Sequence, residues 1–149
     1  MKTPTKPLRP YLEETTRLRV RYQEVDLMRI VWHGHYVAYF EDARRAFGRR
    51  YGIDYPVFRT QDVAVPVVNL WLDYKLPARF NDELKVKARL YKTDAAKLEF
   101  AYEIHCGRKL LVTGGSVQVF TRPDGELLLT SPPFLEELYR QWEGLWIRP

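Results

Sequence analysis

Cysteine is almost missing from this 149-residue chain, which contains only Cys106. A disulfide within the chain is therefore impossible, and a reducing cytoplasm is the simplest setting for the protein. The chain also lacks any run of about 18 apolar residues, the length that a membrane-spanning helix needs. Its first residues, MKTPTKPLRPYLEE, lack the apolar stretch of a signal peptide. We therefore expect a cytoplasmic protein with no integral membrane segment.

Motifs of several common active sites are missing as well. There is no C-x-x-C pair for a metal and no G-x-S-x-G motif for a nucleophilic serine. Two of the three histidines, His33 and His35, are separated only by Gly34, while His105 stands alone. Side chains two residues apart on a helix point about 200° apart, which is poor geometry for binding one ion. We expect neither a metal site nor a cofactor.

The net charge of +5 is the only feature that would suit a nucleic-acid partner. An anionic membrane or a phosphate-bearing ligand would suit it equally well. The basic residues are mostly dispersed, and the densest group, RRAFGRR at 44–50, is typical of a solvated helix face. We therefore do not expect nucleic-acid binding.

What the chain does have is regular alternation of apolar and polar residues. In RLRVRY, at 17–22, Leu18, Val20 and Tyr22 alternate with arginines, which predicts a half-exposed strand. Residues 1–15 contain three prolines and no periodicity, so we expect a flexible N-terminal arm there. Residues 16–149 are expected to form a single domain.

The period changes to that of a helix at His35. The spacing of Tyr36, Phe40, Ala43 and Phe47 predicts one apolar helix face, and Gly52 is a suitable residue to end the helix.

Four strands are predicted after this helix. Residues 63–74, VAVPVVNLWLDY, change the phase of their alternation, which indicates a bulge or a strand buried on both faces, and Pro66 favours a position at a sheet edge. The others are LKVKARLY, KLEFAYEI and LLVTGGSVQVF, and in the last of them Gly114 and Gly115 suggest a close approach by another backbone. PPFLEELYRQWEG then predicts a short helix. Short turns imply antiparallel neighbours, so the expected class is α+β.

The stretch DLMRIVWHGHY, at 26–36, is the best candidate for chemistry, and two interpretations remain open from its residues alone. One is that the stretch is no more than a helix start, whose free N–H groups are matched by a cap and by the nearby charge of Asp26. Alternatively, those N–H groups hold an oxyanion during acyl transfer while the carboxylate acts on a carbonyl, and the apolar run Ile30–Trp32 keeps the site dry.

Two segments carry a resemblance to a known family. VRYQEVDLMRIVWHGHYVAYFEDAR (20–44) has an aspartate, an IVWH run and a helix with E-x-A-R, and YKLPARFNDELKVKARL (74–90) has a matching strand turn. Together with the order of elements, they resemble the hot-dog acyl-CoA thioesterases of the 4-hydroxybenzoyl-CoA thioesterase family, including its Tol–Pal-associated members. The resemblance implies a five-stranded antiparallel sheet wrapped around one long central helix.

The resemblance also implies roles for particular residues. Asp26 aligns with the catalytic carboxylate, as nucleophile or general base, and His33 aligns with the helix N-terminus that polarises the thioester carbonyl. The neighbouring candidates for substrate binding are Arg29, Val31, Trp32, Gly34 and His35. Arg29 stands where relatives usually have glycine and His35 where many have asparagine, which leaves a non-catalytic binding module as the alternative function.

Further expectations concern the coenzyme and the assembly. The family binds acyl-CoA, so Lys92, Lys97 and Arg79 are candidates for contacting the coenzyme phosphates. An acyl carrier protein is a possible alternative partner, and the resemblance implies a homodimer or homotetramer. Glu41 is a rival catalytic carboxylate, although a salt bridge with Arg44 or Arg45 is the simpler interpretation.

Overall fold

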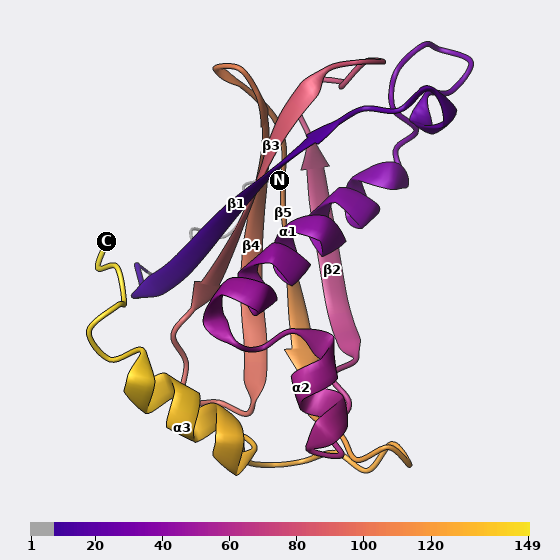
Figure 1. Ribbon diagram of the computed structural model, residues 1–149. Coiled ribbons are helices and arrows are strands. Elements are labelled where there is room, and N and C mark those ends of the chain that lie inside the picture. The colour runs from indigo at the N-terminus through magenta and orange to yellow at the C-terminus, as the bar shows by residue number, and fades with distance from the viewer. Residues whose placement is uncertain (1–7) are drawn as a thin grey trace.

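The computed structural model describes residues 8–149, and in it a long helix crosses one face of an antiparallel sheet (Figure 1). The helix is α1 (His35–Tyr51), and strand β1 (Tyr11–Arg19) precedes it. The later strands are β2 (Val67–Tyr74), β3 (Glu83–Tyr91), β4 (Lys97–Cys106) and β5 (Lys109–Val119). Their order in the sheet is β1-β3-β4-β5-β2, and all neighbours pair antiparallel. The predicted α+β arrangement is confirmed.

Helix α1 forms because its apolar residues recur at helical spacing and can all face the sheet. The predicted face, Tyr36, Phe40, Ala43 and Phe47, is at most 3% exposed. Gly52 ends the helix in the left-handed conformation, with φ of 85°, which glycine adopts without steric cost. The predicted helix and its C-cap are therefore confirmed.

The core lies between α1 and the central strands. The inward residues of β3 and β4 alternate as predicted and are at most 2% exposed: Leu84, Val86, Ala88, Leu90, Leu98, Phe100, Tyr102 and Ile104. Phe40 stacks on Tyr102 with ring centroids 4.4 Å apart, and Phe47 meets Phe100 edge-on at 5.3 Å. These contacts fix the helix over β4, so the start of α1 has a defined position relative to the sheet.

Strand β2 has the irregularity that its sequence indicated. Its pairing with β5 shifts register between Val67 and Asn69, and it forms an edge of the sheet just after Pro66. Opposite it, a Cβ on Gly114 would lie 2.5 Å from the backbone oxygen of Trp71, so only glycine fits there. The predicted bulge, edge and close approach are all confirmed.

Two expectations about the N-terminal part need correction. Strand β1 begins at Tyr11 and pairs with β3 from there, so residues 11–15 belong to the sheet and not to an arm. Residues 1–7 of the expected arm lie outside the described part. Tyr22 is 78% exposed because the chain leaves the strand and turns into the short 3-10 helix η1 (Tyr22–Glu24).

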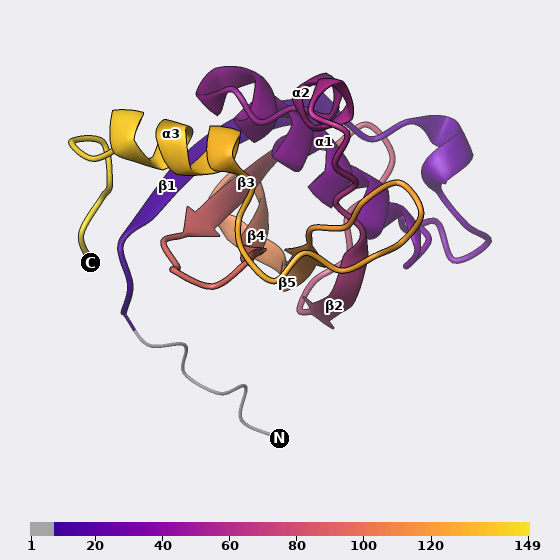
Figure 2. The same ribbon diagram turned by 90° about the horizontal axis from the view of Figure 1, so that it is seen from below.

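Two short helices complete the chain. Helix α3 (Pro133–Gln141) was predicted, whereas α2 (Tyr55–Thr60) was not, because six residues are too few to show helical periodicity. Seen from below, α1, α2 and α3 lie on the same side of the sheet (Figure 2).

Tyr139 of α3 gives a pH-dependent prediction. It packs against Trp142 and Trp146, and burial raises its pKa from 10.0 to about 12. Between these two values the folded chain holds a proton that the unfolded chain has lost, so stability present below pH 10 should disappear as the pH rises to 12. The free energy of unfolding should fall by about 3 kcal/mol over this range.

Urea unfolding between pH 8 and pH 12 measures this loss, with Tyr139→Phe as the comparison. Other buried tyrosines add their own pH dependence to both proteins. The relevant quantity is therefore the difference in the free energy of unfolding between the parent protein and Tyr139→Phe at each pH. Equal pH slopes for both proteins would contradict the prediction.

Candidate active site

Residues 25–31 form a tight hairpin between η1 and α1. Val25 and Val31 bridge its base, and the N–H of Asp26 donates to the carbonyl of Ile30 at 2.9 Å. Arg29 lies at its tip with φ of 64°, a left-handed conformation that costs a residue other than glycine about 1–2 kcal/mol. The chain therefore keeps a turn suited to glycine although arginine occupies it.

The carboxylate of Asp26 is held by this hairpin. Its Oδ1 accepts the N–H of Met28 at 2.8 Å, which fixes the orientation of the group. Within residues 8–149, Oδ2 has no hydrogen-bond partner, and the side chain is only partly buried. One carboxylate oxygen thus maintains the geometry while the other remains available.

The start of α1 presents backbone N–H groups. The carbonyl of Trp32 accepts the N–H of His35 at 2.9 Å, which orients the peptide that carries the N–H of His33. Gly34 is the N-cap residue and offers no side-chain cap. In the described chain, the N–H groups of His33 and Gly34 have no acceptor. They lie at the positive end of the helix dipole, where a negative charge is favoured.

A pocket of about 290 Å³ joins the hairpin, the helix start and the end of β2. Its lining residues are Asp26, Met28, Ile30, Val31, His33, Tyr36, Tyr74, Lys75, Leu76 and Pro77. Asp26 and His33, seven positions apart in the sequence, therefore line the same pocket. A carboxylate and a helix N-terminus facing one cavity can act together on a carbonyl group.

Of the other residues predicted to bind substrate, some line this pocket and others do not. Val31 lines the pocket, but Arg29, Trp32, Gly34 and His35 are not among its lining residues. Trp32 is 47% exposed, and its ring contacts those of His33 and His35. The expectation that Trp32 keeps the site dry is thus not supported, because its side chain packs over the outside of the helix start.

Two tyrosines of the pocket were not predicted as site residues. The hydroxyl of Tyr74 donates to the carbonyl of His33 at 2.8 Å, and the hydroxyl of Tyr36 accepts the N–H of Ala78 at 3.0 Å. Burial raises the pKa of Tyr36, and the nearby charge of Asp26 contributes, so it stays a neutral phenol. Both tie the helix start to the connection between β2 and β3. No local pattern links residues so distant in sequence.

Glu41 does not line this pocket. Its carboxylate pairs with the buried guanidinium of Arg44, as the simpler interpretation of the sequence predicted. Nor do the described residues contain any group of three His, Cys, Asp or Glu side chains able to hold a metal.

The candidates for coenzyme binding lie in two places. Arg79 follows Pro77 of the pocket by two residues. Lys92 and Lys97 lie beyond the far end of β3, whose nine residues span about 30 Å. They also have partners, since Lys97 pairs with Glu99 at 2.9 Å and Lys92 approaches Glu143 at 3.8 Å. Of these three predicted coenzyme-binding residues, only Arg79 is near the pocket of the same chain.

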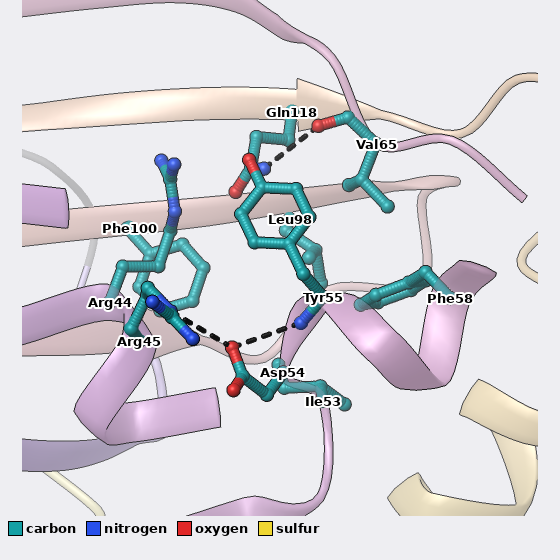
Figure 3. Close-up of a pocket in the computed structure, with 10 residues that line it drawn as sticks. All are labelled: Arg44, Arg45, Ile53, Asp54, Tyr55, Phe58, Val65, Leu98, Phe100 and Gln118. Carbon is teal, nitrogen blue, oxygen red and sulfur yellow. Dashed lines mark hydrogen bonds and ion pairs between the residues drawn. The ribbon is translucent and has the colours of Figure 1, made fainter. Parts of the chain in front are cut away.

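A second pocket lies between α1, α2 and the sheet (Figure 3). Arg44 and Gln118 are buried beside it, and Gln118 donates through Nε2 to the carbonyl of Val65 at 2.9 Å. Its free volume of about 20 Å³ is enough for roughly one water molecule. It is too small for an acyl group. The pocket at Asp26 is the candidate active site because it brings a carboxylate and a helix N-terminus together.

Comparison with known proteins agrees with this architecture. A family profile described as the thioesterase-like superfamily matches residues 20–141. The acyl-CoA thioester hydrolase YbgC of Escherichia coli O157:H7 is 28% identical over 102 residues, which are 68% of this chain and 76% of that protein. No helix of residues 8–149 is long and apolar enough to span a membrane.

Solved structures give the same result. A hypothetical protein from Thermus thermophilus is 34% identical with a TM-score of 0.76, over 88% of this chain and 98% of that one. A DHNA-CoA thioesterase from Staphylococcus aureus is 26% identical with a TM-score of 0.80, and the match covers 89% of this chain and 92% of that one. The resemblance to hot-dog thioesterases is confirmed, and the chain belongs to the thioesterase-like superfamily.

Proposed function

We propose that this enzyme hydrolyses an acyl-CoA thioester to the free acid and coenzyme A. The observation that carries the proposal is the single pocket lined by both Asp26 and His33, with free backbone N–H groups at the helix start. The chain's membership of the thioesterase-like superfamily and the activities of the relatives named above support the same substrate class.

In the proposed reaction, the thioester carbonyl oxygen faces the N–H of His33. As a general base, Asp26 takes a proton from water through Oδ2 while the water oxygen bonds to the carbonyl carbon. The negative charge that develops on the carbonyl oxygen is stabilised by the N–H group and the helix dipole. The C–S bond then breaks, the thiolate of coenzyme A takes up the proton, and the acid is released.

The same carboxylate can act as a nucleophile instead. Oδ2 then bonds to the carbonyl carbon, the thiolate departs, and a mixed anhydride between Asp26 and the acyl group is hydrolysed by water. Mass spectrometry of the protein after rapid acid quenching distinguishes the two routes, because only the nucleophilic route adds the mass of the acyl group to the chain.

A panel of short, long and aromatic acyl-CoAs, followed by release of free thiol, tests the proposed function. Acyl carrier protein thioesters belong in the same panel as the second proposed substrate class. Turnover of at least one thioester is expected. Tight binding without turnover would instead favour the non-catalytic module, and the absence of both would overturn the proposal.

We also propose that the active form is a homo-oligomer built along β2. This strand has a neighbour on one side only, and Val67, Val68, Leu70 and Tyr74 are each at least 40% exposed. An exposed apolar edge strand is a ready template for pairing with a second copy. Because Tyr74 also lines the pocket, such pairing would place the second copy next to the active site.

The double variant Val68→Lys, Leu70→Lys should convert the oligomer to monomer, because the two lysines place positive charge in the contact between the copies. Light scattering after size exclusion measures the change. The matched control is Leu129→Lys, because Leu129 is 84% exposed and lies outside the sheet. A parent protein that is already monomeric would contradict this proposal without affecting the proposed reaction.

A further inference from the structure

Glu24 is the only aspartate or glutamate in residues 8–149 that is buried, with 7% of its surface exposed. It ends η1, two residues before Asp26, and does not line the pocket. A buried carboxylate is costly unless hydrogen bonds and charges compensate it. The proposed reaction does not use this group, so its burial needs another explanation.

The carboxylate of Glu24 is held within its own turn and lies close to helix α1. Its Oε1 accepts the N–H of Arg21 at 2.7 Å, and its Oε2 lies 3.8 Å from the Arg21 guanidinium. Nearby is Tyr39 of α1, which is 2% exposed and whose hydroxyl has no hydrogen-bond partner within the described residues. Burial and then the charge of Glu24 raise the pKa of Tyr39, so this buried hydroxyl remains protonated beside the carboxylate.

The backbone of Glu24 makes a third connection. Its carbonyl accepts the N–H of Trp32 at 2.9 Å, and the next peptide carries the N–H of His33. Glu24 is thus bonded to the helix start while lying two residues from Asp26. The two groups proposed to act on the thioester are joined through this one residue.

We propose that Glu24 is a positioning residue for the Asp26 hairpin. Its carboxylate fixes the turn at Arg21 beside the buried Tyr39 of α1, and its carbonyl holds the N–H of Trp32 at the helix start. It does not touch substrate. Misplacing a reacting group by a fraction of an ångström lowers the rate, so the effect of Glu24 should fall on kcat. The kinetic part of this proposal rests on the proposed function, whereas the structural part does not.

Glu24→Gln and Tyr39→Phe, singly and together, test the kinetic part with the best thioester of the panel. Each single variant is expected to lower kcat about tenfold with KM nearly unchanged, because each alters one member of the buried Glu24–Tyr39 pair proposed to position the hairpin. The double variant should lose little more than either single one, because both substitutions disrupt the same pair. Additive losses, or a change in KM alone, would overturn the proposal.

Glu99→Gln is the matched control. Glu99 is a half-buried carboxylate paired with Arg9 and Lys97, at the far end of the sheet. Its loss should lower stability without lowering kcat. An equal fall in kcat for Glu99→Gln would show that the Glu24 effect is only one of stability, and would count against a positioning role.

Limited trypsin digestion tests the structural part without any substrate. Arg29 lies exposed at the hairpin tip, and Arg108 lies exposed in the β4–β5 turn. In Glu24→Gln, cleavage after Arg29 should become about tenfold faster while cleavage after Arg108 stays unchanged. Unchanged cleavage after Arg29, or equal acceleration at both sites, would overturn the proposal even if no thioester in the panel is hydrolysed.

Discussion

Asp26→Asn should reduce thioester hydrolysis by about a thousandfold while leaving the fold intact. A positioned general base or nucleophile typically contributes a factor of 10²–10⁴ to the rate. The asparagine oxygen can still accept the N–H of Met28, so the hairpin should keep its shape. Thiol release measured with the best acyl-CoA gives kcat, and thermal unfolding checks the fold.

Two other carboxylates of α1 make this result specific. Asp42→Asn alters an exposed side chain and should leave kcat unchanged. Glu41→Gln removes the partner of Arg44 and should cost stability more than rate. Full activity in Asp26→Asn would remove Asp26 from the mechanism while leaving the enzyme assignment standing. A large loss of kcat in Glu41→Gln alone would make Glu41 the catalytic carboxylate.

Gly114→Ala should strongly destabilise the sheet, lowering the free energy of unfolding by about 3 kcal/mol. The added Cβ would lie 2.5 Å from the backbone oxygen of Trp71 and 2.7 Å from the ring of Phe40. Because one neighbour is backbone and the other is the central helix, neither can move without disturbing the pairing of β2 or the core. The melting temperature should fall by about 6–12 °C.

Gly144→Ala is the matched control, since a Cβ there would meet no atom within 4 Å. Its melting temperature should stay within about a degree of the parent protein. If Gly114→Ala melted as the parent does, the close approach of β2 to β5 at this point would be wrong.

The main elements were predictable from the sequence because each has a local signal. The helical spacing from Tyr36 to Phe47 and the two-residue alternation of β3 and β4 both record which side chains face the core. Pro66 and Gly114 marked the sheet edge and the close approach, since the steric properties of proline and glycine restrict where each is tolerated. The start of β1 was missed because prolines precede it and its apolar side is interrupted by polar residues.

The site was predictable only in part. The resemblance pointed to Asp26 and His33, whereas Tyr74 and the segment 75–77 were not recognised as site residues. Nothing in the local pattern of β2 shows that its end meets the helix start. The same limit explains Trp32, because an apolar residue beside a site can face either into the pocket or away from it.

By itself, the sequence determined the order of the strands, the long helix and α3, the core-facing residues of α1, β3 and β4, and the two ends of α1. These depend on backbone preferences and on periodicity, which act over a few neighbouring residues. Only the tertiary structure decided that Asp26, the start of α1 and Tyr74 share one pocket, and that Glu24 is buried behind the hairpin. These depend on contacts across more distant parts of the chain, which form only when α1 packs on the sheet.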